Sequence, residues 1–415
     1  MAPHNGLMHG TEYQVEGSNV ELIGSDVDHR VKYASAATEP AWNNGIIGVQ
    51  PGLFVWRIED FQVVPVPEAE VGVFYDGDSY IVLHSYQLGN SDEQRLGHEI
   101  YFWLGAHTSQ DEAGTAAYKT VELDEFLQGT ASQNRELQAS PSPGFLRLFP
   151  QRITIRRGGV ATGFTHVEET VEEQAKTARK TLLLRVFKQP GMRSSQGIVV
   201  HEVEPVPSSL DDEDVFVLDA AGSDAVYVWQ GRSCSPMEKA RAADVAQDLL
   251  TPAHTDGVQV LAQDEARSGV VLRLLEQEEA AASGSQQERP AEAPSFYRSA
   301  RPISEREPVG DEPKKTLWRL SDDAGQLSFA LEREGSDAQL SDFDSSDVFL
   351  WDDAGRMVWV WEGLGASINE RAQWLRVAQA YVQRLGAQLG LHELPPMGKV
   401  REGYESNAFL SSLQE

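Results

Sequence analysis

The sequence lacks several features that would each point to a particular class of protein. It has a single cysteine, Cys234, so the chain cannot form an internal disulfide and its fold does not depend on oxidation. No apolar run approaches the roughly eighteen residues of a membrane-spanning helix. The first residues show no basic segment followed by an apolar core, so we expect no secretory signal. These absences favour a cytoplasmic protein.

Catalytic motifs and a basic excess are also missing. The sequence contains no G-x-x-x-x-G-K-[ST] phosphate loop, no H-E-x-x-H zinc motif and no G-x-S-x-G nucleophile motif. The net charge is −29, which argues against general nucleic-acid binding. We therefore expect a protein that is not an enzyme and whose acidic surface is compatible with cations as ligands.

Two segments poor in large apolar residues divide the 415-residue chain, which is too long for one ordinary core. Their composition is typical of linkers. We predict an N-terminal extension over 1–40, three blocks over 41–165, 180–275 and 313–415, and linkers over 166–179 and 276–312.

The three blocks share a pattern of acids. Each contains an acidic turn before an apolar strand, in "FYDGDSYIVL", "LDDEDVFVLD" and "FDSSDVFLWD". A second, aromatic strand follows and ends in glycine, and a glutamate comes seven residues after that glycine. An apolar strand with a basic residue lies upstream. The aligned residues are Asp78, Asp214 and Asp347; Gly105, Gly231 and Gly363; and Glu112, Glu238 and Glu370.

Apolar residues three and four apart follow each glutamate and predict a long helix. Every block therefore has three strands, a long helix and a closing apolar segment. The sequence predicts a mixed α/β domain of about 100 residues, present three times.

The repeated acids allow two interpretations. Aspartate before a strand can simply accept turn hydrogen bonds, and glutamate in the first turn of a helix is favoured by the macrodipole. However, the same residue types at the same spacing recur in all three blocks, and two converging carboxylates repel each other unless a cation lies between them. Oxygen ligands suit Ca²⁺, and the absence of histidine and cysteine from these repeated positions disfavours zinc. We expect Ca²⁺ as a cofactor.

The first block also carries Asp124, in "VELDEFLQGTA", at the end of the predicted helix. Gly129 and Ala131 follow and could offer carbonyl ligands. Taken alone, aspartate and glycine at a helix end are more typical of a cap.

The first block resembles the first repeat of the gelsolin, severin, fragmin and villin proteins. The resemblance rests on "PGLFVWRIEDFQVVPVP", "GDSYIVL", "EIYFWLGAHTSQDEAGTAAYKTVELDEFLQG" and "RRGGVATGF", and covers residues 39–165. The other blocks match more loosely but in the right order. Three repeats are the severin and fragmin arrangement. The resemblance implies gelsolin-like repeats, each with a central mixed sheet between a long and a short helix.

The resemblance further implies a protein that severs actin filaments and caps their barbed ends under Ca²⁺ control. The internal metal sites would use Gly77, Asp78, Glu112 and Val160; Glu213, Asp214 and Glu238; and Ser346, Asp347 and Glu370. A second site in the first repeat would use Asp124, Gly129 and Ala131, completed by a carboxylate from actin.

The resemblance also assigns two binding surfaces. Actin would contact a helix spanning about Ser109 to Leu127 through Tyr118, Val121 and Leu123, with Phe61, Gln133 and Arg135 beside it. Val121 and Leu123 could instead face the domain's own core. Phosphoinositide lipids would bind Arg156, Arg157, Arg185 and Lys188, which could equally be solvated surface residues. Two other functions remain open: capping without severing, and an actin-independent Ca²⁺-binding scaffold.

Overall fold

The computed structural model describes residues 36–88, 95–160, 180–189, 197–284, 314–388 except 324 and 336, and 394–414. These residues form two compact units. One unit comprises Met1–Glu68, Ser79–Phe145 and Arg306–Glu415, and the other comprises Ala69–Asp78 and Leu146–Glu305. The predicted linker 166–179 and most of the predicted N-terminal extension lie outside the described residues.

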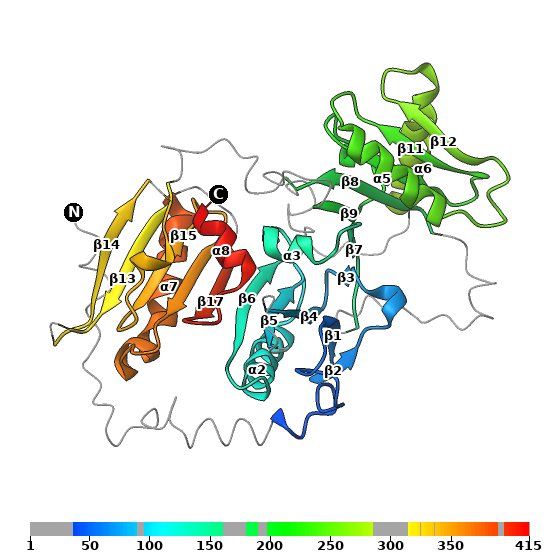
Figure 1. The fold of residues 1–415 in the computed structure, drawn as a ribbon. Coiled ribbons are helices and arrows are strands. Elements are labelled where there is room, and N and C mark those ends of the chain that lie inside the picture. The colour runs from blue at the N-terminus through cyan, green and yellow to red at the C-terminus, as the bar shows by residue number, and fades with distance from the viewer. Residues whose placement is uncertain are drawn as a thin grey trace. The chain divides into compact units, whose positions relative to one another are not determined.

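The first unit is built on a ten-stranded sheet with the order β14-β13-β15-β16-β17-β6-β5-β4-β1-β2 (Figure 1). Its strands from the first block are β1 (Gly52–Glu59), β2 (Gln62–Pro65), β4 (Ser79–Gln87), β5 (Leu96–Leu104) and β6 (Ala131–Leu137). Those from the third block are β13 (Thr316–Ser321), β14 (Ser328–Glu334), β15 (Val348–Asp352), β16 (Val358–Glu362) and β17 (Met397–Arg401).

The two halves of this sheet join where β17 pairs with β6 in antiparallel register. Met397 lies opposite Arg135, and Lys399 lies opposite Gln133. The sequence predicted a separate sheet for each block, and the structure instead shows one sheet shared by two blocks. The reason is that β6 and β17 each lie at the edge of their own block's part of the sheet, and a strand edge exposes backbone groups that another edge can pair.

Helices cover the faces of this sheet. They are α2 (Gln110–Phe126), α7 (Ile368–Gln388) and α8 (Asn407–Gln414), and the short helix α3 (Pro143–Arg147) follows β6. In the third block, alternate strand residues face opposite sides: Leu350 packs with Val382 of α7, and Trp351 with Phe409 of α8. In the first block, Ile81 packs with Leu123 of α2.

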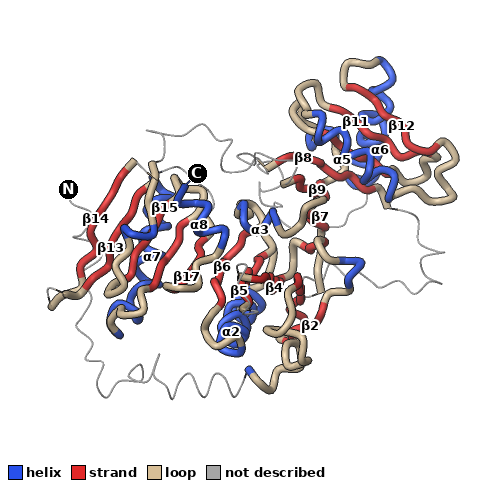
Figure 2. The backbone as a smooth tube through the Cα atoms, in the orientation of Figure 1, coloured by secondary structure: helices blue, strands red, loops and turns tan. Residues whose placement is uncertain are grey.

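The second unit has a seven-stranded sheet with the order β12-β11-β10-β8-β9-β7-β3 (Figure 2). Its strands are β3 (Val73–Tyr75), β7 (Ile153–Arg156), β8 (Leu182–Lys188), β9 (Ile198–Val203), β10 (Val215–Asp219), β11 (Ala225–Gln230) and β12 (Gly257–Ala262). The first block thus contributes β3 and β7 to the sheet of the second block, which the sequence did not predict. β7 pairs in parallel with β9.

Two helices of similar length pack on opposite faces of the second sheet. Helix α5 (Pro236–Asp248) covers Val217 and Val228, whereas α6 (Gly269–Gly284) covers Phe216 and Leu218. The expected short helix is therefore a long one, and it extends into the segment predicted as a linker from residue 276. Alanine and glutamate, which dominate the start of this segment, and leucine, which precedes it in α6, are strong helix formers.

One buried carboxyl in the first unit makes stability depend on pH. Glu136 of β6 is fully buried and accepts hydrogen bonds from the backbone N–H and hydroxyl of Ser142. Burial raises its pKa to about 8. Because the folded protein then binds this proton more tightly than the unfolded chain, the stabilisation is present at low pH and is lost as the pH rises toward 8.

We therefore predict that the free energy of unfolding falls by up to about 1.4 kcal/mol per pH unit between pH 5 and 8 through this group. Glu136→Gln should flatten the slope in denaturant titrations made across this range. An unchanged slope in the variant would contradict the assignment of the titration to Glu136.

Candidate functional site: paired carboxylates

The glycine that ends the second aromatic strand allows the acidic turn to approach closely. The Gly231 N–H donates to the Asp214 carbonyl at 2.9 Å, and the Gly363 N–H donates to the Asp347 carbonyl at 3.1 Å. A side chain on Gly231 would lie 2.5 Å from the Asp212 carbonyl oxygen, and one on Gly363 would overlap the Ser345 carbonyl. The repeated glycine therefore lets the acidic turn pack directly against the end of the second aromatic strand.

The repeated glutamate belongs to a helix cap. Ser235 and Ser367 each accept a hydrogen bond from the backbone of the glutamate three residues later, and Glu238 and Glu370 accept one in return from the serine N–H. In the first block, Ser109 accepts from the Glu112 N–H at 3.1 Å. Helix capping thus gives the glutamate at this position a structural role, beyond the macrodipole effect expected from the sequence.

In the second block, Asp214 forms a buried salt bridge with Arg185 of β8. Burial raises the pKa of Asp214 to about 6, although the Arg185 charge acts in the opposite direction. The negative charge of Glu238 also reaches Asp214 and raises this pKa. The carboxylates of the aspartate and the glutamate of this block therefore interact electrostatically. The backbone of predicted ligand Glu213 belongs to the exposed turn just before Asp214.

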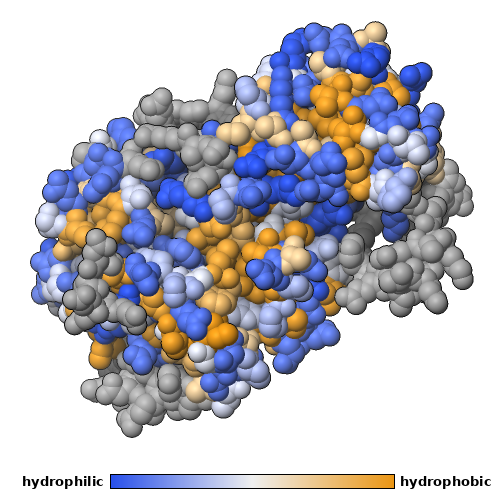
Figure 3. Space-filling view, turned by 45° about the vertical axis from the view of Figure 1, so that its right-hand side comes forward, coloured by the Kyte–Doolittle hydropathy of each residue, from blue (hydrophilic) through white to orange (hydrophobic). Residues whose placement is uncertain are grey.

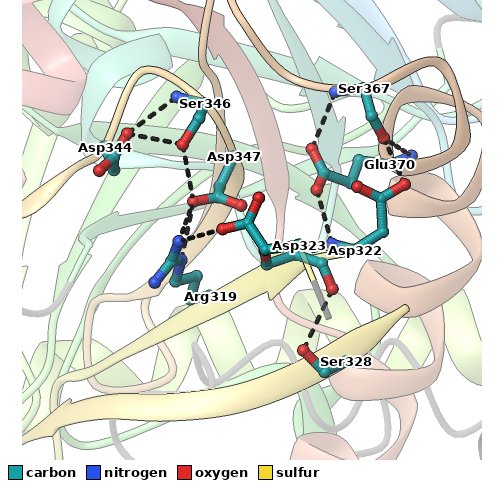
Figure 4. A network of polar contacts seen from close by, with 10 residues as sticks. Arg319, Asp322, Asp323, Ser328, Asp344, Ser346, Asp347, Ser367 and Glu370 are labelled. Atoms are coloured by element: carbon teal, nitrogen blue, oxygen red, sulfur yellow. Dashed lines mark hydrogen bonds and ion pairs between the residues drawn. The ribbon is translucent and has the colours of Figure 1, made fainter. Parts of the chain in front are cut away.

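The third block repeats this arrangement (Figure 4). The Arg319 guanidinium donates to Asp347 Oδ2 at 2.8 Å and to Asp323 at 3.1 Å. Glu370 Oε1 accepts from the Asp322 N–H at 2.9 Å. Burial raises the pKa of Glu370, and the charges of Asp322 and Asp347 raise it further. Asp347 is fully buried, and within the described part of the chain its Oδ1 has no hydrogen-bond partner.

The predicted ligands of the first block are divided between the two units. In one unit, Asp78 Oδ1 accepts from the Val160 N–H at 2.8 Å, and a side chain on Gly159 would overlap Asp78. In the other, Glu112 Oε2 accepts from the Thr108 hydroxyl at 3.1 Å. Glu112 Oε1 is buried and, among the described residues, has no hydrogen-bond partner.

Asp76 had no assigned role in the sequence, and the structure gives it one. Its Oδ1 accepts from the Gly158 N–H at 2.8 Å, and its own N–H donates to the Arg156 carbonyl. The Gly77 N–H donates to the Gly158 carbonyl at 2.8 Å. Asp76 therefore attaches the acidic turn to the end of β7 and the residues that follow it. The sequence could not show this role, because the partners of Asp76 lie about 80 residues away.

No three carboxylate, histidine or cysteine side chains of the described residues are grouped to hold a metal ion. In the second and third blocks, an arginine forms a salt bridge with the aspartate. The glutamate carboxylate accepts hydrogen bonds from backbone N–H groups. The metal sites of these two blocks therefore stay a prediction.

The comparisons with known proteins identify the repeats. The model of the gelsolin repeat matches residues 60–146 and 198–267. The chain is 36% identical to Gelsolin-like protein 1 of Lumbricus terrestris over 97% of this chain and 98% of that protein. The chain belongs to the gelsolin family.

Other gelsolin-family proteins resemble the chain over most of their length. Severin of Echinococcus granulosus is 33% identical over 91% of this chain and 92% of its own. The actin depolymerising venom protein gelsolin 1 of Platymeris rhadamanthus is 32% identical over 81% of this chain and 82% of its own. The gelsolin-like fold predicted from the sequence is therefore confirmed.

The gelsolin-family helix α2 presents some of the predicted actin contacts at its surface. Tyr118 of α2 is 57% exposed and Val121 is 36% exposed, and Phe61, in the turn between β1 and β2, is exposed as well. Leu123, by contrast, is fully buried in the block's own core. Leu123 therefore faces the domain's own core, whereas Val121 stays available for actin. In Figure 3, apolar residues form patches between hydrophilic ones on the visible face.

The other predicted actin contacts lie at the pairing of β6 with β17. Gln133 and Arg135 are half-buried opposite β17. Asp124 accepts from the Ala131 N–H at 3.0 Å and from the Gln133 amide at 2.7 Å. Burial raises the pKa of Asp124 to about 6, and the charge of Lys399 on β17 acts against this shift. The Arg401 guanidinium lies next to Gly129.

The predicted lipid-binding residues do not form one basic surface. Arg185 is buried and forms a salt bridge with Asp214, so its guanidinium is not available to a lipid. The assignment of Arg185 to lipid binding is therefore corrected. Arg156 pairs with Glu202 at 3.2 Å. The phosphoinositide prediction therefore rests on Arg156, Arg157 and Lys188. Within the described ranges, no helix is long and apolar enough to cross a membrane.

Proposed function

We propose that this protein binds actin, severs filaments and caps their barbed ends under the control of Ca²⁺, and that the structure represents its closed form. Its similarity to severin and to an actin depolymerising gelsolin over most of each chain supports the activity. The work is mechanical, and we place it in the cytoplasm. The repeats would follow the boundaries predicted from the sequence, except that the second would extend to the end of α6 at Gly284.

The observation that carries the closed form is the pairing of β17 with β6. β17 lies opposite the predicted actin contacts Gln133 and Arg135. It also places Lys399 and Arg401 beside Asp124 and Gly129, two residues of the metal site that actin would complete. A filament cannot contact this edge while the third block covers it. The third block must therefore separate from β6 before the first block can bind.

The carboxylates fit a calcium ion in their chemistry. Glu112 Oε1 and Asp347 Oδ1 are buried and, among the described residues, lack hydrogen-bond partners. Such buried acceptors are costly unless a donor or a cation satisfies them. Ca²⁺ accepts both carboxylate and carbonyl oxygen, and when bound it would neutralise the clustered acids. The predicted metal residues keep the roles that the resemblance assigns to them.

The exposed side chains of α2 would then make the first contact with actin. Tyr118 and Val121 project from the helix, whereas Leu123 holds the helix to the sheet. Binding that requires the open form shifts the population toward it. Ca²⁺ and actin would therefore favour the same state of the protein.

The test is the depolymerisation of diluted fluorescent actin filaments with Ca²⁺ or with a chelator. The proposal expects faster depolymerisation with Ca²⁺ and a decrease in filament length by microscopy. Capping without severing would instead slow depolymerisation and leave lengths unchanged. An actin-independent scaffold would not co-sediment with filaments in either condition, which would overturn the proposal.

A further inference from the structure

The same salt bridge forms in the second and third blocks. Arg185 of β8 lies opposite Phe216 of β10, and Arg319 of β13 lies opposite Phe349 of β15. Each aspartate, Asp214 or Asp347, comes two residues before that phenylalanine. Residues two apart on a strand face the same side of a sheet, so the arginine reaches the aspartate diagonally. The strand register therefore builds this pair twice.

We propose that Arg185 and Arg319 are internal competitors of Ca²⁺, each holding the metal-binding aspartate of its block until the ion displaces it. This inference rests on the proposed Ca²⁺ sites of the second and third blocks. A guanidinium satisfies carboxylate oxygens by charge-assisted hydrogen bonds. The guanidinium holds Oδ2 of the aspartate, so an ion that takes both carboxylate oxygens must displace it. The arginine thus raises the Ca²⁺ concentration that each site requires.

The two arginines differ in what they do after displacement. The Arg319 side chain is 33% exposed and already bonds Asp323, which is itself exposed. It can leave Asp347 while keeping one partner and gaining water. Arg185 is buried, and its guanidinium lies 5.0 Å from the centre of the Phe187 ring. Leaving Asp214 therefore costs Arg185 more, so the third block should fill at lower Ca²⁺ than the second.

The experiment is equilibrium dialysis of the full chain with radioactive Ca²⁺, which reads binding without actin. Arg319→Gln should tighten the third-block site by about tenfold, because a competing ion pair within hydrogen-bond distance is removed. Arg333→Gln is the matched control, since it removes the same charge from an arginine that pairs with Asp342 in the same block. It should leave binding nearly unchanged. Asp347→Asn identifies the third-block site by removing it.

Arg185→Gln should increase the Ca²⁺ affinity of the second-block site by a larger factor than Arg319→Gln increases that of the third-block site. Arg152→Gln is its control, because it removes the same charge from an arginine that pairs with Asp248. If leaving Asp214 unpaired unfolds this variant, Arg185→Lys preserves the charge but not the planar fork, and it should give a smaller tightening. Unchanged affinities in the Arg319 and Arg185 variants would overturn the inference. Absence of any Ca²⁺ binding by the unmodified chain would instead overturn the proposed Ca²⁺ control, which is a different outcome.

Discussion

Oxidising a variant with Arg135→Cys and Met397→Cys should abolish severing in Ca²⁺, and a reductant should restore it. The two residues lie directly opposite each other on β6 and β17. In such antiparallel pairs the Cβ atoms are about 4.5–5.5 Å apart, near the roughly 3.5–4.5 Å of a disulfide. The cross-link would hold the third block on the first. Filament depolymerisation, measured before and after reduction, checks the result.

The controls use the same chain. Cys234, the native cysteine, is buried, so each single-cysteine variant should respond little to oxidation. Because Arg135 is itself a predicted actin contact, the comparison is between the oxidised and reduced states of one protein. Full severing by the oxidised, cross-linked form would mean that β6 need not be uncovered.

The second large effect is expected at α2. Tyr118→Asp should weaken actin binding by about 30- to 900-fold, since losing a central aromatic contact costs about 2–4 kcal/mol. Tyr118 is 57% exposed, so the fold should tolerate the change. Binding of actin monomers in Ca²⁺, measured by fluorescence, checks the prediction.

A matched variant separates a contact from a general charge effect. Leu375→Asp places the same charge on α7, at an exposed leucine with no predicted actin role. It should leave the affinity for actin nearly unchanged. Equal losses in the two variants would show that α2 is not the actin-binding helix. Melting curves should confirm that both variants fold.

Much of each block could be predicted because local patterns determine it. The helix expected over Ser109 to Leu127 is observed as Gln110–Phe126. Ser109 is its N-cap and Leu127 is its C-cap. Serine, the following glutamate and the apolar period act within a few residues of one another. The glycine repeated at the end of the second aromatic strand likewise has one structural role in two blocks, since Gly231 and Gly363 both contact the acidic turn.

The exchange of strands between blocks could not be predicted. β17 joins β6, and β7 joins β9, through backbone hydrogen bonds that every residue except proline can make. No side-chain pattern distinguishes these edges from solvent-exposed ones. The partner of Arg319 was hidden for a similar reason, because it depends on the register of β13 with β15 rather than on neighbours in sequence.

Ca²⁺ control of actin binding depends most on whether Ca²⁺ separates β17 from β6. Hydrogen–deuterium exchange of the backbone amides in 131–137 and 397–401 measures this directly, because paired amides exchange only when the strands part. The predicted result is faster exchange in both segments when Ca²⁺ is added to the chain without actin. Unchanged protection of both segments at a Ca²⁺ concentration that activates severing would contradict the account.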